Sequence, residues 1–331
     1  MLDLSFVVVS WNAKQYLVEC LKSIENEATS FRYEIIVVDN GSSDGTVEIL
    51  QANFTDVVLI CNGENLGFAK ANNIGIKKCK GKYICLINSD VKLMQGCIFS
   101  MVQYLNTYPS IGILGPRIFN SDLTKQNSCK YFPTLLNEFF RAAALDAIFK
   151  DTRFKAVFKP HSSPDVITSV DVLSGCFWMV RKEAFDEVGL FDERFFIYAE
   201  DKDLCKRFKE KGWKIVYNPN AQAIHYGGAS SANAPIRFYI EMQFANLQYW
   251  EKHFNKRGKY LYSIILFLFH VNRVIVYRLA RAVRRTNKAA YDHKIERSVF
   301  SLRWLFNRKE VISQHDILRF PEKGINGRQM L

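Results

Sequence analysis

The sequence predicts an α/β protein with a central, mostly parallel sheet flanked by helices, followed by a helical and basic C-terminal appendage. Short runs rich in Val, Ile and Leu alternate with helix-length segments over the first 120 residues, as in βαβ units. Polar residues gather directly after those runs, at the edge where ligands bind in open α/β sheets. The excess positive charge is confined to the end of the chain.

Four strands are predicted in the first part of the chain, at Leu4–Val9, Glu34–Val38, Val57–Cys61 and Tyr83–Ile87. Each run is short and continuously apolar, which is typical of a parallel strand buried on both faces. The carboxyl ends of such strands lie at one edge of the sheet. We therefore expect a ligand site among the polar residues that follow them: Ser10, Asn12, Asp39, Asn65, Asn88 and Asp90.

The second part of the chain is less regular before the pattern returns. Residues 120–165 contain three prolines and are interpreted as an insertion. Strand structure is expected to resume at 167–180. An amphipathic helix at Lys202–Lys211 and a short strand at Lys214–Tyr217 are predicted to follow, and they lead to His225.

The most unusual segment is Phe191–Leu204, which places five carboxylates within twelve residues of otherwise aromatic and apolar sequence. Carboxylates favour water and their neighbours favour a core, so the segment is expected to line a cleft. A partly desolvated carboxylate has a raised pKa and can act as a general base. A second acidic site, Asn88-Ser89-Asp90, directly follows a predicted strand and could hold a metal ion against a phosphate.

Six motifs occur in a fixed order between residues 4 and 230. They are V-V-V-S-W-N at 7–12, I-V-V-D-N-G-S-S-D-G-T at 36–46, N-L-G-F-A-K-A-N-N-I-G at 65–75, N-S-D at 88–90, S-G-C-F at 174–177, and the acidic run followed by His225. In these motifs and their spacing the chain resembles the inverting glycosyltransferases of family 2, which have the Rossmann-like GT-A fold. Within that family it looks like the rhamnosyltransferase branch.

The resemblance implies a GT-A domain at residues 1–230, with a nucleotide-binding half at 1–119 and an acceptor and catalytic half at 120–230. It also implies metal-dependent transfer of a sugar from a nucleotide-diphospho-sugar to a hydroxyl group, with inversion at the anomeric carbon. The leading donor is dTDP-L-rhamnose, and a UDP-hexose is the alternative. The expected acceptor is a polyprenyl-diphosphate-linked or growing cell-surface glycan.

The resemblance assigns the donor nucleotide to the first half of the chain. Asp39 is expected to accept a hydrogen bond from the pyrimidine N3–H, which uracil and thymine share, whereas Asp44 is expected to cap the next helix. Asn65 and Gly67 are expected to shape the nucleotide pocket. Lys70 either reaches a phosphate or is a solvated helix residue.

Asn88-Ser89-Asp90 stands where the family has D-x-D, with Asn in place of the first Asp. Asp90 is still expected to bind Mg²⁺ or Mn²⁺ beside the diphosphate, since Mg²⁺ often uses only one or two carboxylates together with substrate phosphates. By resemblance His225 completes the metal or diphosphate site. A purely structural histidine is the alternative.

Glu200-Asp201-Lys202-Asp203 resembles the family's E-D-x-D motif, in which the position of Asp201 is the catalytic base. Asp203 lies two residues further along a helix and therefore points elsewhere, so it is expected to cap the helix or pair with a basic group. Gly175 is expected to let the backbone approach the sugar, and Glu200 is expected to contribute to the donor pocket.

The C-terminal region, residues 231–331, is expected to be helical, basic and membrane-associating. From Lys256 onward there are 17 Lys or Arg and 5 Asp or Glu, which accounts for the whole formal charge of +12. The apolar run Ile264–Phe269 is six residues long, and polar residues break it before a spanning length is reached. An apolar helix with a basic cluster favours an anionic membrane surface. The alternative is that Ile264–Val276 is a core or homodimer helix.

Other functions are disfavoured. Neither a G-x-G-x-x-G after the first strand nor a P-loop pattern occurs, and a nucleotidyltransferase would need a Gly-rich basic loop where this chain has Ser10-Trp11-Asn12-Ala13. The basic tail lacks a nucleic-acid-binding motif, so nucleic acid is not an expected partner. A non-catalytic membrane scaffold remains as an alternative, favoured by Asn88 alone.

The cellular location follows from cysteine usage and the N-terminus. The eight cysteines form no C-x-x-C pair, and several lie in predicted core strands, so they are expected to be reduced. Leu4–Ser10 is interpreted as a strand, with no basic and apolar leader before it. We expect a cytoplasmic protein, peripheral on the inner face of the cell membrane.

Overall fold

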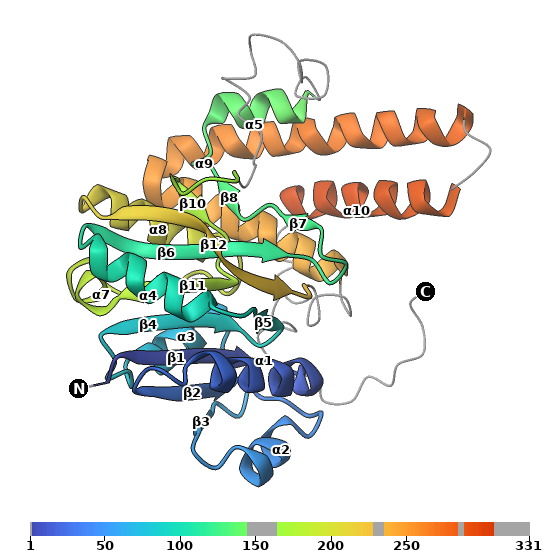
Figure 1. Cartoon of the computed structure of the whole chain (residues 1–331). Coiled ribbons are helices and arrows are strands. Elements are labelled where there is room, and N and C mark those ends of the chain that lie inside the picture. Colours follow the sequence, from blue (N-terminus) through green and yellow to red (C-terminus); the bar gives the residue numbers. More distant parts are fainter. Residues whose placement is uncertain (1, 144–163, 228–234, 284–287, 308–331) are drawn as a thin grey trace.

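The computed structural model describes residues 2–143, 164–227, 235–283 and 288–307 as an α/β body with a layer of helices beyond it (Figure 1). The body is organised by a ten-stranded sheet whose main path runs β3-β2-β1-β4-β11-β6-β12-β5. Four neighbouring pairs on that path are parallel and three are antiparallel, so the predicted mostly parallel α/β sheet is confirmed.

The first half of the sheet is all parallel. Its strands are β1 (Leu4–Ser10), β2 (Tyr33–Asp39), β3 (Val58–Cys61) and β4 (Tyr83–Asn88), all within a residue of the predicted bounds. Ser10 lies opposite Asp39, and Val9 lies opposite Asn88, so three strands end side by side. β3 differs from the expectation of burial on both faces: it is the edge strand, and Val58 is 45% exposed.

The second half of the sheet is mixed. β11 (Phe177–Arg181) lies antiparallel between β4 and β6 (Ile111–Phe119). β12 (Lys214–His225) is much longer than the predicted strand, because it continues past a bulge between Asn218 and Gln222 to pair with β5. The remaining strands are β5 (Val91–Leu93), β7 (Lys125–Gln126), β8 (Cys129–Lys130), β9 (Thr168–Ser169) and β10 (Val172–Leu173).

Helices cover both faces of the sheet, which explains why its central strands are continuously apolar. On one face Leu17, Leu21 and Met101 pack against Phe6, and on the other Phe208 packs in the cluster around Trp178. The first face is covered by α1 (Lys14–Glu27), α2 (Thr46–Asn53) and α4 (Cys97–Thr107), and the second by α3 (Phe68–Ile76), α7 (Lys182–Val188) and α8 (Glu200–Glu210). All eight cysteines are free, and only Cys61 is exposed.

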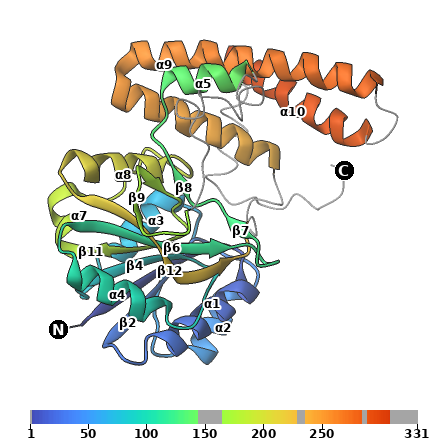
Figure 2. The ribbon, with the colours of Figure 1, turned by 45° about the horizontal axis from the view of Figure 1, so that its top comes forward.

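A separate layer of helices lies beyond the sheet (Figure 2). It consists of α5 (Leu135–Ala142), α9 (Pro235–Val283) and α10 (Lys288–Phe306), so the predicted C-terminal helices are confirmed. α9 bends at Phe254 and Asn255, whose backbone angles are not helical. Trp250, Tyr262 and Trp304 form the core between the two arms of α9 and α10.

The apolar part of α9 is mostly uncovered. Among the described residues, the stretch Arg237–Val283 is long and apolar enough to cross a membrane by length and composition alone, and 17% of its most apolar part is buried. The short run that was expected to fall below spanning length therefore belongs to a helix that passes this simple test. The bend at Phe254–Asn255 divides that helix into two arms.

Candidate active site

Ser10 and Asp39 are buried and lie side by side at the ends of β1 and β2. Asp39 is 2% exposed, and its Oδ2 accepts hydrogen bonds from the backbone N–H groups of Gly41 (3.1 Å) and Ser42 (3.0 Å). The other oxygen, Oδ1, is buried and has no hydrogen-bond partner, and neither has Ser10 Oγ. Because an unsatisfied buried acceptor is costly, Asp39 Oδ1 is suited to accept from a ligand N–H group.

Asparagine side chains tie the adjoining loops together. The backbone N–H of Asn12 donates to Ser42 Oγ at 2.9 Å, which joins the loops after β1 and β2. Asn65 Oδ1 accepts from the Asn40 side chain (2.8 Å) and from the backbone N–H of Gly67 (3.0 Å). The side chain of Lys70 is exposed on α3, as in the solvated alternative.

Gly67 brings the loop before α8 against this pocket. Its φ is +85°, and an added Cβ would lie 2.6 Å from the carbonyl oxygen of Phe196. The backbone N–H of the next residue, Phe68, donates to that same oxygen at 2.6 Å. Any larger residue at Gly67 would therefore separate the nucleotide side of the site from the acidic segment.

Asp90 and His225 meet although 134 residues separate them in sequence, and they form a polar corner at the end of β4. The bulge in β12 allows His225 to pair with Val91, and His225 Nε2 lies 3.2 Å from Asp90 Oδ1. His225 Nδ1 lies 2.9 Å from Gln126 Oε1, an oxygen that can only accept, so Nδ1 carries a proton. In the neutral ring Nε2 then presents its lone pair towards Asp90, as a metal ligand does.

The protein ligands in this corner are few. The part of the chain that the structure describes contains no group of three or more His, Cys, Asp or Glu side chains that could hold a metal ion. Asn88 Oδ1, also at the end of β4, is buried without a hydrogen-bond partner. A carboxylate, an imidazole and an amide oxygen suit a cation such as Mg²⁺ or Mn²⁺ that takes its other ligands from substrate phosphates and water.

The acidic corner is built on a strained helix start. Tyr198 and Ala199 both have positive φ (71° and 64°), which is uncommon outside glycine, and Glu200 begins α8 directly after them. Asp201 is 13% exposed, and its Oδ2 lies 3.5 Å from Lys130 Nζ on β8. A Cβ on Gly175 would lie 3.5 Å from Asp201 Cβ, so these two residues are in close approach.

Glu200 and Asp201 have different electrostatic surroundings. Burial, together with the neighbouring Asp201, raises the pKa of Glu200 to about 8, and Glu200 Oε2 has no hydrogen-bond partner. The charge of Asp201 in turn raises the pKa of Lys130. Glu200 therefore provides a protonated carboxyl group at neutral pH directly beside the Asp201 side chain, and neighbouring carboxyl groups in different surroundings can take acid and base roles. Sequence reasoning missed Lys130, which lies in the irregular segment and carries no motif.

Segment 174–177 connects the two corners. The carbonyl oxygen of Cys176 accepts from the backbone N–H of Asn88 at 2.9 Å, next to the corner of Asp90 and His225, while Gly175 lies against Asp201. The structure thus brings the predicted residues from both halves to one edge of the sheet. Part of the predicted acceptor-side insertion, residues 144–163, lies outside the described residues.

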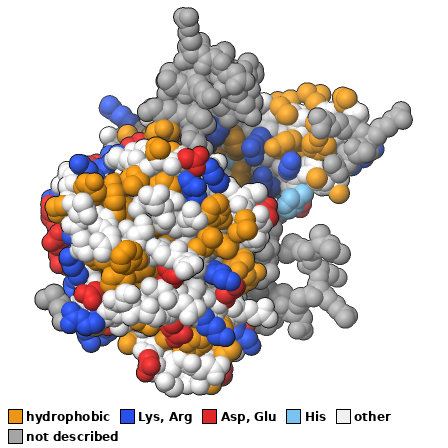
Figure 3. Space-filling view, viewed as in Figure 1, with side chains coloured by type: hydrophobic (Ala, Val, Ile, Leu, Met, Phe, Trp, Pro, Cys, Tyr) orange, Lys and Arg blue, Asp and Glu red, His pale blue; other side chains and the backbone are white. Residues whose placement is uncertain are grey.

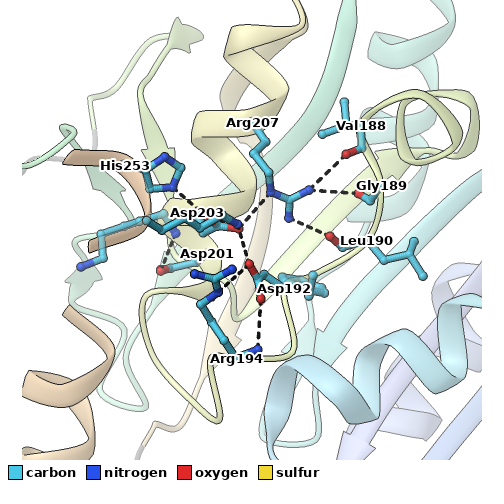
Figure 4. Close-up of polar contacts among 12 residues, drawn as sticks. Val188, Gly189, Leu190, Asp192, Arg194, Asp201, Asp203, Arg207 and His253 are labelled. Atoms are coloured by element: carbon cyan, nitrogen blue, oxygen red, sulfur yellow. Dashed lines mark hydrogen bonds and ion pairs between the residues drawn. The ribbon is translucent and has the colours of Figure 1, made fainter. Parts of the chain in front are cut away.

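Asp203 has the structural role that its spacing predicts (Figure 4). It is fully buried and accepts from Arg207 Nε (2.9 Å), Lys252 Nζ (2.6 Å) and His253 Nε2 (2.8 Å). These partners hold its pKa at about 2 despite burial. Arg207 also donates to the carbonyl oxygen of Leu190 at 2.7 Å, so Asp203 joins α8 to α9 and to the loop before the acidic segment.

Sequence comparisons identify relatives of one kind. The sequence model of glycosyl transferase family 2 matches residues 5–189. The N-acetylglucosaminyl-diphospho-decaprenol L-rhamnosyltransferase of Mycobacterium tuberculosis H37Rv is 29% identical over 243 residues, which cover 70% of this chain and 78% of that protein. Rhamnosyltransferase WbbL of Escherichia coli K12 is 28% identical over 253 residues (73% and 91%), and dTDP-rhamnosyl transferase RfbF of Shigella flexneri is 27% identical over 259 residues (75% and 80%).

Solved structures share the fold. The mannosyltransferase PcManGT from Pyrobaculum calidifontis, in complex with GDP-Man and Mn²⁺, superposes with a TM-score of 0.54 at 14% identity and covers 92% of this chain and 87% of that one. GalNAc-T7 with UDP, GalNAc and Mn²⁺ gives a TM-score of 0.55 at 13% identity and covers 97% and 58%. At these identities the likeness concerns the fold alone.

Proposed function

Since the chain belongs to glycosyl transferase family 2, with the GT-A fold that its motifs predict, we propose that this glycosyltransferase moves L-rhamnose from dTDP-L-rhamnose to a hydroxyl of a lipid-linked or growing cell-surface glycan. The observation that carries the proposal is the meeting of Asp39, Asp90 and Asp201 at one edge of the sheet. The names of three relatives favour rhamnose as the sugar. A UDP-hexose is the second candidate donor, because uracil and thymine carry the same N3–H group.

The donor would bind at the strand ends, in residues 1–119 of a catalytic unit that extends to residue 230. The unpartnered Asp39 Oδ1 would accept from the pyrimidine N3–H, with Ser10 and Asn12 beside it. Asn65 and Gly67 would shape the far wall of the pocket. This assignment predicts that an N3-methylated pyrimidine nucleotide is rejected.

Asp90 and His225 would hold Mg²⁺ or Mn²⁺, and the amide oxygen of Asn88 would lie beside them. When bound, the ion would offset the negative charge of the departing diphosphate. Electron paramagnetic resonance of Mn²⁺ tests the assignment without turnover. Binding should strengthen when dTDP is added and should weaken at least tenfold in Asp90→Asn, as expected for the loss of a charged ligand.

Asp201 would act as the general base of a single displacement. It takes the proton of the acceptor hydroxyl while that oxygen bonds to the anomeric carbon and the bond to the diphosphate breaks, which inverts the configuration. The ammonium group of Lys130 lies 3.5 Å from Asp201 Oδ2 and contacts the proposed base directly. Protonated Glu200 is suited to donate to a sugar hydroxyl, and Gly175 leaves room for the sugar next to Asp201.

Turnover of a donor panel by detergent-solubilised protein tests the function. dTDP-rhamnose, UDP-hexoses and GDP-sugars would be offered with Mg²⁺ or Mn²⁺ and a polyprenyl-diphosphate sugar. Transfer from one donor, lost with EDTA and reduced at least ~100-fold in Asp201→Asn, is the expected result for a lost general base. Asp186→Asn removes an exposed carboxylate on α7 and serves as the control. Full activity of Asp201→Asn would refute the assignment of the base.

Residues 231–331 would place the enzyme on an anionic membrane surface, peripheral to the inner face of the cell membrane. Large apolar side chains are exposed along α9, among them Leu261 (47%), Ile275 (53%) and Leu279 (63%). Figure 3 shows apolar side chains on these projecting helices with basic side chains between them. Sedimentation with phosphatidylglycerol vesicles, but not with phosphatidylcholine vesicles, is the expected result. A stable dimer that binds neither kind of vesicle would favour the alternative that α9 is a homodimer helix.

A further inference from the structure

A pocket lies between α5 and the second arm of α9, outside the site described above. Its volume is about 280 Å³, and its lining includes Arg141 from α5 and Phe269, Asn272, Arg273 and Tyr277 from α9. The Asn272 side chain donates to the carbonyl oxygen of Ala142 at 3.0 Å, which fixes the two helices against each other. The volume is near the lower end of the roughly 300–1,000 Å³ typical of ligand sites, and it suits a small charged group.

The polar lining of this pocket is cationic. The Arg273 guanidinium lies 4.3 Å from the centroid of the Phe269 ring and 5.8 Å from that of Tyr277, and Arg273 forms no ion pair with any described residue. Lys294 Nζ lies 5.4 Å from the Tyr277 centroid. Arg141 forms an ion pair with Glu138. A cation held over aromatic faces without a carboxylate retains its N–H groups for an anion, and guanidinium groups match phosphate oxygens in pairs.

Large apolar side chains are exposed on the two helices that form the pocket, and one of them, Val276, lines it. Leu136 (53% exposed) and Phe139 (44%) lie on α5, and Ile275 (53%) and Val276 (47%) lie on α9. Contact with these apolar side chains would not stabilise a free inorganic anion. It would stabilise an anion that carries a long hydrocarbon chain, because the charge and the chain would bind to adjoining surfaces.

The layer of helices that carries the pocket contacts the helix of the proposed base, because the Lys202 side chain donates to Asn246 Oδ1 on the first arm of α9. Arg141 and Glu138 both influence the pKa of Lys202, the residue after Asp201, although burial is the largest cause of its lowered value. α5 therefore lies within electrostatic range of the start of α8. A group bound between α5 and α9 would be held on the layer of helices that adjoins α8.

We propose that this pocket binds the diphosphate group that joins the acceptor glycan to its lipid, with the lipid chain along the apolar surface of α5 and α9. The inference rests on the proposed function for its acceptor class and adds to it the site that holds that acceptor. Arg273 would bind the phosphate oxygens, and Asn272 and Tyr277 would complete the polar lining.

Direct binding tests the pocket without sugar transfer. The full chain would be titrated calorimetrically, in EDTA, with geranylgeranyl diphosphate, inorganic diphosphate and phosphatidylglycerol vesicles. Arg273→Gln should weaken geranylgeranyl diphosphate binding roughly 10- to 100-fold, as for the loss of a charged hydrogen-bond donor. Arg278→Gln, an exposed arginine on the same helix that does not line the pocket, should change it less than about twofold. Unchanged melting temperatures would show that both variants fold.

The outcomes separate the ligand sources. Equal binding of geranylgeranyl diphosphate by Arg273→Gln and wild type would overturn the proposal. Inorganic diphosphate binding as tightly as the prenyl compound would overturn the lipid part, and a loss confined to vesicles would assign Arg273 to lipid headgroups instead. In transfer assays, Arg273→Gln should raise KM for a lipid-diphosphate acceptor about tenfold or more, but not for an alkyl glycoside or for the donor. If wild type binds the prenyl probe but turns over no donor, the proposed function fails and the pocket stands.

Discussion

Asp203→Asn should distinguish the roles of the two aspartates in the Glu200-Asp201-Lys202-Asp203 motif. It should destabilise the fold without removing the proposed base, Asp201. Asp203 is fully buried, and Arg207, Lys252 and His253 donate to its carboxylate. Asn keeps the shape of the side chain but loses the charge. Two cations are then left near an uncharged group, and a link between α8 and α9 is weakened.

The magnitude follows from the pKa of about 2 that these partners give Asp203. Against an unfolded value of about 3.9, the difference corresponds to roughly 2.6 kcal/mol at neutral pH. Breaking a buried ion pair from one side typically costs about 3–5 kcal/mol, so a loss of about 3 kcal/mol is expected. Because the folded pKa lies below the unfolded one, this stabilisation is present above about pH 4 and is lost as pH falls towards 2.

Thermal unfolding and turnover should be measured on the same preparations. At pH 7 Asp203→Asn should melt about 6–12 °C below wild type, at about 2–4 °C per kcal/mol. Asp186→Asn, at an exposed position on α7, should shift the melting temperature by less than about 2 °C. Well below its melting temperature Asp203→Asn should retain transfer, whereas Asp201→Asn should melt like wild type and be inactive. A melting temperature for Asp203→Asn that matches Asp186→Asn would refute the reasoning.

Two further predictions concern titration. Because burial raises the pKa of Glu200 to about 8, its carboxyl is mostly protonated at pH 7, and Glu200→Gln should keep kcat within about fivefold, the equivalent of one neutral hydrogen bond. Wild type should lose activity as pH rises through about 8 and Glu200→Gln should not, so identical pH–rate profiles would contradict this. Burial lowers the pKa of His270 to about 4, so its neutral form is favoured on folding and stability should fall by about 2 kcal/mol between pH 6.5 and 5. In urea unfolding experiments, the free energy of unfolding of His270→Gln should fall less over this pH range than that of wild type. Equal dependence on pH in the two proteins would exclude His270 as the cause.

The first half of the sheet could be predicted almost to the residue because its strands are apolar on both faces. β1, β2 and β4 differ from prediction by a residue at each end at most, and their carboxyl ends carry Ser10, Asp39 and Asn88 as expected. β12 was underestimated for a physical reason: Asn218, Pro219 and Asn220 interrupt its pattern, and these residues form a bulge that a local reading takes as the end of the strand.

Residues of the candidate site could be predicted where they belong to a sequence motif. Residues that reach the site only through contacts across the fold could not. Asp201 and Asp203 were assigned different directions from helical spacing alone, and the contacts of Asp203 agree with that reasoning. Lys130 and Gln126 have no local signal, because their meaning depends on strands of two residues that bring them to Asp201 and His225. The bend in α9 at Asn255, with a φ of +58°, has no glycine or proline at the bent residues themselves. Gly258 is required there because an added Cβ would lie 2.4 Å from Phe254 Cβ, a contact that only the folded structure shows.

Asp201 and Asp203 on α8 contact different parts of the molecule, and α8 therefore joins the proposed base to the layer of helices. Asp201 turns towards Lys130 on β8, at the edge of the sheet, while Asp203 turns towards Lys252 and His253 on α9. One short helix therefore carries the proposed base and is clamped to the element that presents the exposed apolar surface. If α5 and the second arm of α9 hold the lipid end of the acceptor, two features together would set its separation from Asp201: the Asp203 contacts to the first arm of α9, and the packing of Trp250 against Tyr262 that joins the two arms. The distance from the second arm of α9 to the start of α8 would then select acceptors by the length of glycan between the diphosphate and the reacting hydroxyl.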